Sequence, residues 1–200
     1  MRNTVTTRKN EVIRSPKWLT FLFNNPKAGL IWLPIRVWLG YQWIEASLHK
    51  LESPAWMQTG AALKGFWTSV VAIPAQGNPP IHYAWYRNFL QYMLNTNQYV
   101  WFAKLVAIGE LLVGIALILG IFTAFAALMG GVMNFSFMLA GSASVNPVFL
   151  LISIGLILAW KVAGYFGADY FLIPALANLL GTKEKREDTK PITYPQGAEA

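Results

Sequence analysis

The residues able to do chemistry in this chain are charged and amide side chains set into apolar runs. Glu110 stands in AIGELLVGIALILG, residues 107–120, and a bare charge in hydrocarbon costs at least a few kcal/mol. At a rise of about 1.5 Å per residue, Arg36, Glu110 and Asn134 fall at similar depths in their own segments. We expect them to form a catalytic polar layer that hydrogen-bonds a quinone head or relays protons. The alternative is a buried ion pair that only fixes helix register.

A second polar layer is expected nearer the outer face. Glu45 and His49 lie one helical turn apart, and Lys104 falls at a similar depth in another segment. We predict that Glu45 pairs with Lys104, with His49 beside them, as a substrate-binding group.

Thiol and metal chemistry are not expected. The chain has no cysteine, so it offers no thiolate nucleophile and no disulfide. Its two histidines, His49 and His82, lie far apart in the sequence and suggest neither a metal site nor a heme site. The remaining candidate is a quinone, taken as a substrate.

The elements that must position these residues are long apolar segments. The chain is 55% hydrophobic and 12% charged, which excludes an ordinary water-soluble domain. A membrane span needs about 20 apolar residues, and four segments meet that length: 29–48, 99–120, 122–141 and 147–166. The sequence predicts an all-α integral membrane protein, a bundle of four transmembrane helices.

The connection at 50–98 is too aromatic for a solvated linker. Two stripes at helical spacing predict two short helices on the membrane surface: Trp56, Leu63, Trp67 and Val70, then Tyr86, Phe89, Leu90 and Met93. They either plug the outer end of the bundle or form a lid over a site. The expected layout is a basic tail at 1–28, a membrane domain at 29–174 that includes 50–98, and a second tail at 175–200.

Lysine and arginine gather in both tails, which predicts that both termini are cytoplasmic and that 50–98 lies outside. The net charge of +7 is spread over these two flanks, so anionic lipid headgroups explain it better than nucleic acid.

Three stretches resemble the DoxX family, closest to its DoxD branch, the small membrane subunit of thiosulfate:quinone oxidoreductase. They are RVWLGYQWIEASLHKL from residue 36, GELLVGIALILGIFTAFAALMGGVMNFSFMLAGSASVNP at 109–147 and AGYFGADYFLIP at 163–174. The resemblance implies a multi-pass protein of a bacterial or archaeal cell membrane. It also implies electron transfer from thiosulfate, giving tetrathionate, to the quinone pool, with a DoxA-like partner subunit. It assigns no catalytic role to any single residue.

Two functions of different class follow. The first is a membrane subunit of a quinone-linked oxidoreductase. The second is a non-catalytic subunit that assembles, anchors or stabilises a larger complex in the membrane.

Overall fold

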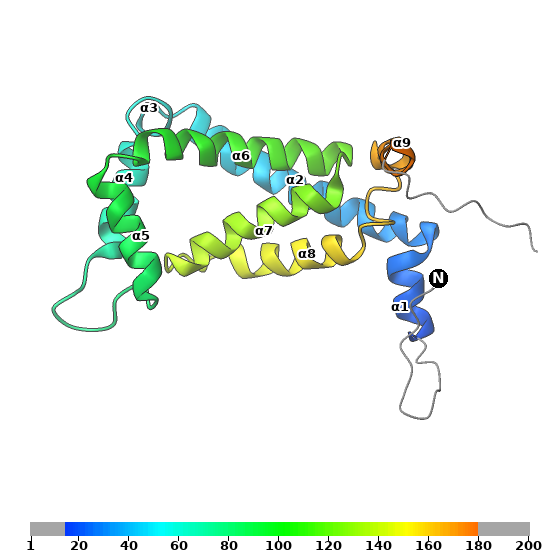
Figure 1. Cartoon of the computed structure of the whole chain (residues 1–200), viewed down its shortest axis with the longest axis horizontal. Helices are drawn as coiled ribbons and strands as arrows, with labels where there is room; N and C mark the ends of the chain where they lie inside the picture. Colours follow the sequence, from blue (N-terminus) through cyan, green and yellow to red (C-terminus); the bar gives the residue numbers. More distant parts are fainter. Residues whose placement is uncertain (1–14, 180–200) are drawn as a thin grey trace, which may run out of the picture.

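Four long helices form the body of the protein. The computed structural model describes residues 15–179, and every regular element in that range is a helix. The body consists of α2 (Gly29–Leu51), α6 (Tyr99–Leu119), α7 (Thr123–Leu139) and α8 (Asn146–Leu158), which run along the long axis in Figure 1. Helix α6 packs against α2 and α7, and α7 packs against α8. The buried core lies among these four helices.

Shorter helices close the two ends of the bundle. At the left end in Figure 1 lie α3 (Pro54–Met57), α4 (Ala61–Val71) and α5 (Ala84–Asn95). At the right end lie α1 (Lys17–Asn24), the 3₁₀ turn η1 (Pro26–Ala28) and α9 (Asp169–Leu179). The two short helices predicted in 50–98 correspond to α4 and α5, whose stripe residues Leu63, Trp67, Val70, Leu90 and Met93 are buried. Trp56, predicted on the first stripe, lies instead on the separate helix α3, and Phe89 is exposed.

The first three long segments agree with the prediction to within a few residues, whereas the fourth does not. Helix α8 ends at Leu158, eight residues before the predicted end, and the chain then turns. Gly164 lies against the next helix so closely that a Cβ there would meet Asp169 Oδ2 at 2.1 Å. The chain beyond Leu158 is therefore folded back on itself rather than continued as a helix.

The four long helices differ in how well their length and composition suit a membrane span. Of the described helices, α6 is both long and apolar enough to cross a membrane, while α7 and α8 are apolar but shorter. Helix α2 is 23 residues long but carries Arg36, Glu45 and Lys50.

Two glycines bring α2 and α6 into backbone contact. A Cβ at Gly40 would lie 2.8 Å from the carbonyl oxygen of Gly114, and a Cβ at Gly114 would lie 2.8 Å from that of Gly40. Any larger residue would separate the helices, so this contact sets the distance across which their polar side chains meet.

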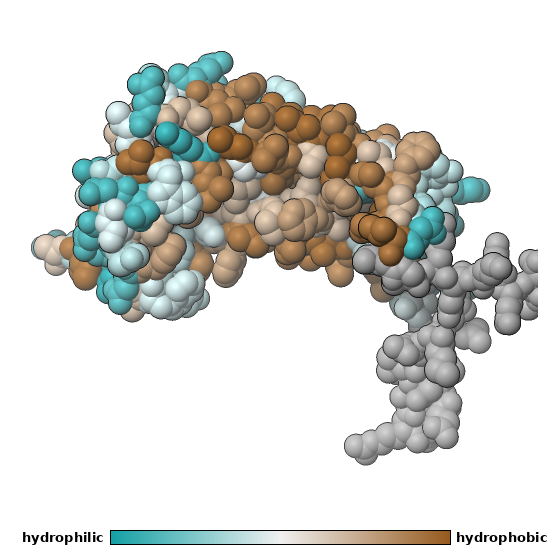
Figure 2. Space-filling model, turned by 45° about the horizontal axis from the view of Figure 1, so that its top comes forward, coloured by the Kyte–Doolittle hydropathy of each residue, from teal (hydrophilic) through white to brown (hydrophobic). Residues whose placement is uncertain are grey.

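The outer surface of the bundle is apolar along its middle. Large apolar side chains of α6, α7 and α8 are exposed there, among them Leu105, Leu112, Phe125, Val132, Leu151 and Leu158. Figure 2 shows this surface as a brown band with hydrophilic residues gathered at the ends. A continuous apolar band of this kind is typical of a surface that faces lipid.

Candidate functional site

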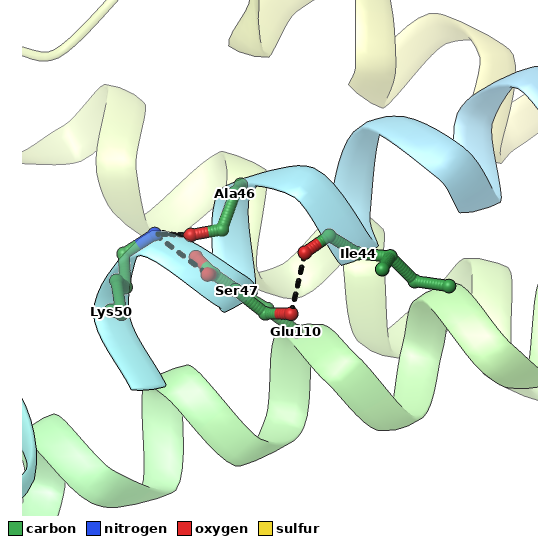
Figure 3. A network of polar contacts seen from close by, with 5 residues as sticks. All are labelled: Ile44, Ala46, Ser47, Lys50 and Glu110. Carbon is green, nitrogen blue, oxygen red and sulfur yellow. Dashed lines mark hydrogen bonds and ion pairs between the residues drawn. The ribbon is translucent and has the colours of Figure 1, made fainter. Parts of the chain in front are cut away.

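Glu110 forms an ion pair with Lys50. The Lys50 ammonium donates a hydrogen bond to Glu110 Oε2 at 2.7 Å and a second one to the Ala46 carbonyl at 3.2 Å, as Figure 3 shows. Glu110 on α6 is 2% exposed, and the Lys50 side chain on α2 is 21% exposed. A charge-assisted hydrogen bond of this length is stronger than a neutral one, and burial removes the screening by water.

The direction of helical side chains explains the pairing. Lys50 lies ten residues beyond Gly40, and Glu110 lies four residues from Gly114 on the antiparallel helix, so their Cα atoms differ in depth by about 9 Å. Side chains in a helix lean toward its N-terminus, which brings the Lys50 ammonium back down to Glu110. The hydrogen bond from Lys50 to the carbonyl of Ala46, four residues earlier, is consistent with this direction of the side chain.

The ion pair lines a cavity of about 430 Å³ between the bundle and the short helices of the left end. One wall is aromatic and comes from α3 to α6: Trp56, Phe66, Trp67, Tyr86, Phe89 and Phe102. The other wall adds polar groups from α7, α8 and their connection: Ser136, Ser142 and Asn146. The short helices of 50–98 therefore wall a cavity as well as covering the bundle.

Tyr86 ties the aromatic wall to α7. Its hydroxyl donates a hydrogen bond to the Ser136 carbonyl at 2.9 Å. Burial raises the pKa of the Tyr86 hydroxyl, so it stays protonated and remains a donor at neutral pH. This bond fixes α5 over the cavity.

The structure does not bring Arg36 to Glu110, so the predicted layer of Arg36, Glu110 and Asn134 is not formed, and neither is the alternative Arg36–Glu110 ion pair. Arg36 is 1% exposed, but its guanidinium lies at the other end of the bundle, where Nη2 donates to the Phe166 carbonyl at 3.2 Å. A Cβ at Gly120 would lie 1.6 Å from Arg36 Nη1, and one at Gly167 would lie 2.7 Å from it. The guanidinium thus occupies space that only glycine leaves open.

Asp169 organises the same end. Its Oδ1 accepts the backbone N–H of Phe122 at 2.6 Å and its Oδ2 that of Thr123 at 2.8 Å, so it caps the start of α7. It also attracts the Arg36 guanidinium electrostatically. The helix that Asp169 caps begins 46 residues earlier in the chain than Asp169 itself.

The other predicted site residues are dispersed. Asn134 is fully buried on α7, at the depth of Glu110, but it does not line the cavity. Glu45 and His49 are exposed and Lys104 is half-buried. No ion pair within 4.0 Å joins Glu45 to Lys104 in the part of the chain that the structure describes, so the second polar layer is not formed. The same residues contain no group of three or more His, Asp or Glu placed to hold a metal ion.

Comparison with known proteins gives one match. The model of the DoxX family matches residues 31–143, more than half of the chain and a stretch that includes both Lys50 and Glu110. The match is to the DoxX family as a whole and assigns no branch. No curated protein and no solved structure matches the chain.

Proposed function

The chain belongs to the DoxX family of membrane-associated proteins, and on that premise we propose that it is the membrane subunit of a quinone-linked oxidoreductase. Its quinone site is the cavity lined by Lys50 and Glu110. The observation that carries the proposal is the Lys50–Glu110 ion pair at the edge of a cavity with an aromatic wall.

The chemistry of the cavity suits a quinone head. A planar ring stacks on aromatic side chains, and the lining offers Trp56, Trp67 and Phe102. Each quinone oxygen accepts hydrogen bonds, and Lys50 has three N–H donors, of which two are engaged by Ala46 and Glu110. A volume of about 430 Å³ is within the ordinary range of small-molecule sites.

An apolar groove supplies a place for the hydrocarbon tail of a membrane quinone. The groove, about 390 Å³, runs between α6 and α7 and includes Leu105, Gly109 and Met133. Those residues are next to or within one turn of the cavity residues Val106, Glu110 and Phe137 on the same helices. We infer that a quinone with its head in the cavity lays its tail in this neighbouring groove, toward lipid.

The reaction consumes two electrons and two protons for each quinone converted to quinol. The Lys50 ammonium stabilises the negative charge that develops on the quinone oxygen, and the Glu110 carboxylate takes up a proton from water and passes it to that oxygen. The electrons come from a partner subunit. For a DoxD-type complex the donor is thiosulfate, two of which give one tetrathionate and two electrons.

We place the four long helices across the cell membrane, with both termini in the cytoplasm. This puts the cavity and helices α3 to α5 at the outer face, where the sequence keeps few lysines and arginines. The competing function is the non-catalytic one. There, the Lys50–Glu110 pair would only extend the glycine contact that holds α2 against α6.

The test is quinone binding to the purified protein in detergent. A ubiquinone analogue with one isoprene unit is titrated in, and binding is followed by quenching of tryptophan fluorescence, since Trp56 and Trp67 line the cavity. Losing a hydrogen bond to a charged donor predicts that Lys50→Met weakens affinity by about 10–150-fold. Glu45→Gln, an exposed change on the same helix, is the control and should bind like the wild type. Undiminished affinity in folded Lys50→Met would leave the non-catalytic function.

A further inference from the structure

Besides the Thr123 hydroxyl at the start of α7, three buried polar side chains near the middle of the bundle have no hydrogen-bond partner within residues 15–179. They are the indole N–H of Trp43 on α2, the amide of Asn134 on α7 and the hydroxyl of Ser153 on α8. Their exposed fractions are 3%, 0% and 0%. Buried polar groups are almost always satisfied, and where protein groups do not reach them, ordered water does.

The three groups converge on one turn of α7. A Cβ at Gly130 would lie 3.2 Å from Trp43 Nε1, and a Cβ at Gly131 would lie 3.5 Å from Ser153 Cβ. Asn134 follows these glycines by one turn on the same face, and its side chain leans back over them. An indole donor, a hydroxyl and an amide with both a donor and an acceptor therefore face one small region.

This region lies about one helical turn from Glu110, on the side away from the cavity. The same Cβ position at Gly130 is 3.2 Å from Val113 Cγ1 on α6. Counted from the Gly130–Val113 contact toward the cavity, Glu110 lies three residues along α6 and Asn134 lies four residues along α7. Each step corresponds to a rise of about 5–6 Å. Water held over Gly130 and Gly131 therefore has about one helical turn to cross to reach the level of Glu110.

We propose that Trp43, Asn134 and Ser153 bind internal water, and that this water delivers protons to Glu110. The proton delivery rests on the proposed function, whereas the water site does not. Each quinol formed takes up two protons, so a proton that Glu110 passes to the quinone must be replaced. Asn134 acts as a positioning residue here, because its amide holds water and carries no proton of its own to donate.

Hydroxyl-radical labelling of the purified protein by X-ray radiolysis tests the water site without any quinone. Radicals form where water is, and Trp32 is the matched control, since it is buried at 8% exposure and its N–H donates to the Leu22 carbonyl at 2.9 Å. We expect Trp43 to be oxidised faster than Trp32, and Asn134→Leu to bring Trp43 down to the rate of Trp32. Oxidation of Trp43 no faster than that of Trp32 in the wild type would overturn the water site.

Proton delivery is tested by stopped-flow reduction of bound one-isoprene ubiquinone with dithionite, which replaces the partner subunit as electron donor. Asn134→Leu should slow quinol formation roughly tenfold and enlarge the solvent deuterium isotope effect, while Asn134→Ser stays within about twofold of the wild type. Quinone affinity should be unchanged in both variants. An unchanged rate and isotope effect in Asn134→Leu would overturn proton delivery. A wild type that binds no quinone would instead overturn the proposed function, with the labelling result unaffected.

Discussion

Replacing Lys50 with methionine should destabilise the protein more than any other single change at the cavity. It keeps the length and most of the volume of the side chain but leaves the Glu110 carboxylate, 2% exposed, without its cation. Removing one partner of a buried ion pair costs about 3–5 kcal/mol. For a chain of this size, about 2–4 °C of melting temperature is lost per kcal/mol, which predicts a fall of about 6–20 °C.

The reverse change, Glu110→Gln, should cost less. The Lys50 side chain is 21% exposed and keeps the Ala46 carbonyl as an acceptor, so its ammonium can turn toward solvent. We expect a cost of about 1–2 kcal/mol. The double variant Lys50→Met/Glu110→Gln removes both charges and should lie within about 1 kcal/mol of the wild type.

Thermal unfolding in detergent, followed by tryptophan fluorescence at one fixed scan rate, measures all three variants. Lys104→Met is the matched control, because Lys104 is a half-buried lysine of α6 with no ion pair within the described residues. The expected order of stability is the double variant, then Glu110→Gln, then Lys50→Met. Losses that simply add in the double variant would refute the coupling between Lys50 and Glu110.

Four further outcomes are expected. Asp169→Ala removes both caps from the start of α7 and should cost about 2 kcal/mol, or about 4–8 °C in thermal unfolding. Gly120→Ala forces a side chain onto a backbone with φ of 69° and into the buried guanidinium, so membranes should contain much less folded protein by immunoblot. Gly109→Leu places a side chain in the apolar groove, where its Cβ would lie 3.7 Å from the Met133 sulfur and so fits without a clash. Fluorescence titration should then show weaker binding of long-tailed quinones and unchanged binding of the one-isoprene analogue. In intact cells an impermeant maleimide should label Gln76→Cys, on the exposed outer connection, and not Thr189→Cys, which lies outside the described residues; the reverse pattern would contradict the topology.

Most of the helices were predictable because apolar residues mark the segments and helix faces that are buried in lipid or in protein. The apolar runs predicted α2, α6 and α7, and the aromatic stripes predicted α4 and α5, since both signals depend on helical periodicity. The end of α8 was not predictable in this way. Ala159, Val162 and Ala163 are buried in a turn beyond the helix, so they extend the apolar run although the helix has ended.

The partner of Glu110 was missed because depth was counted along Cα positions. Arg36 and Lys50 stand on α2 at either side of the level of Glu110, and both side chains lean toward the N-terminus of that helix. The lean takes Arg36 away from Glu110, to Gly120, and brings Lys50 down to it. Applying the direction of helical side chains to the sequence would have favoured Lys50.

One face of α2 accounts for its weak hydropathy as a membrane span. Arg36, Trp43 and Lys50 follow one another at seven-residue intervals, so they share a face that points into the bundle and extends about 21 Å. The mean hydropathy of α2 is lowered by Arg36 and Lys50, although these residues lie on the face that lipid does not contact. The exposed Glu45 and His49 lie in the last two turns, at the cavity end of the helix, where water and headgroups are in reach. Helix α2 can therefore cross the membrane beside α6 despite its charges, with Arg36 at one end bonded to the turn before α9 and Lys50 at the other end lining the cavity.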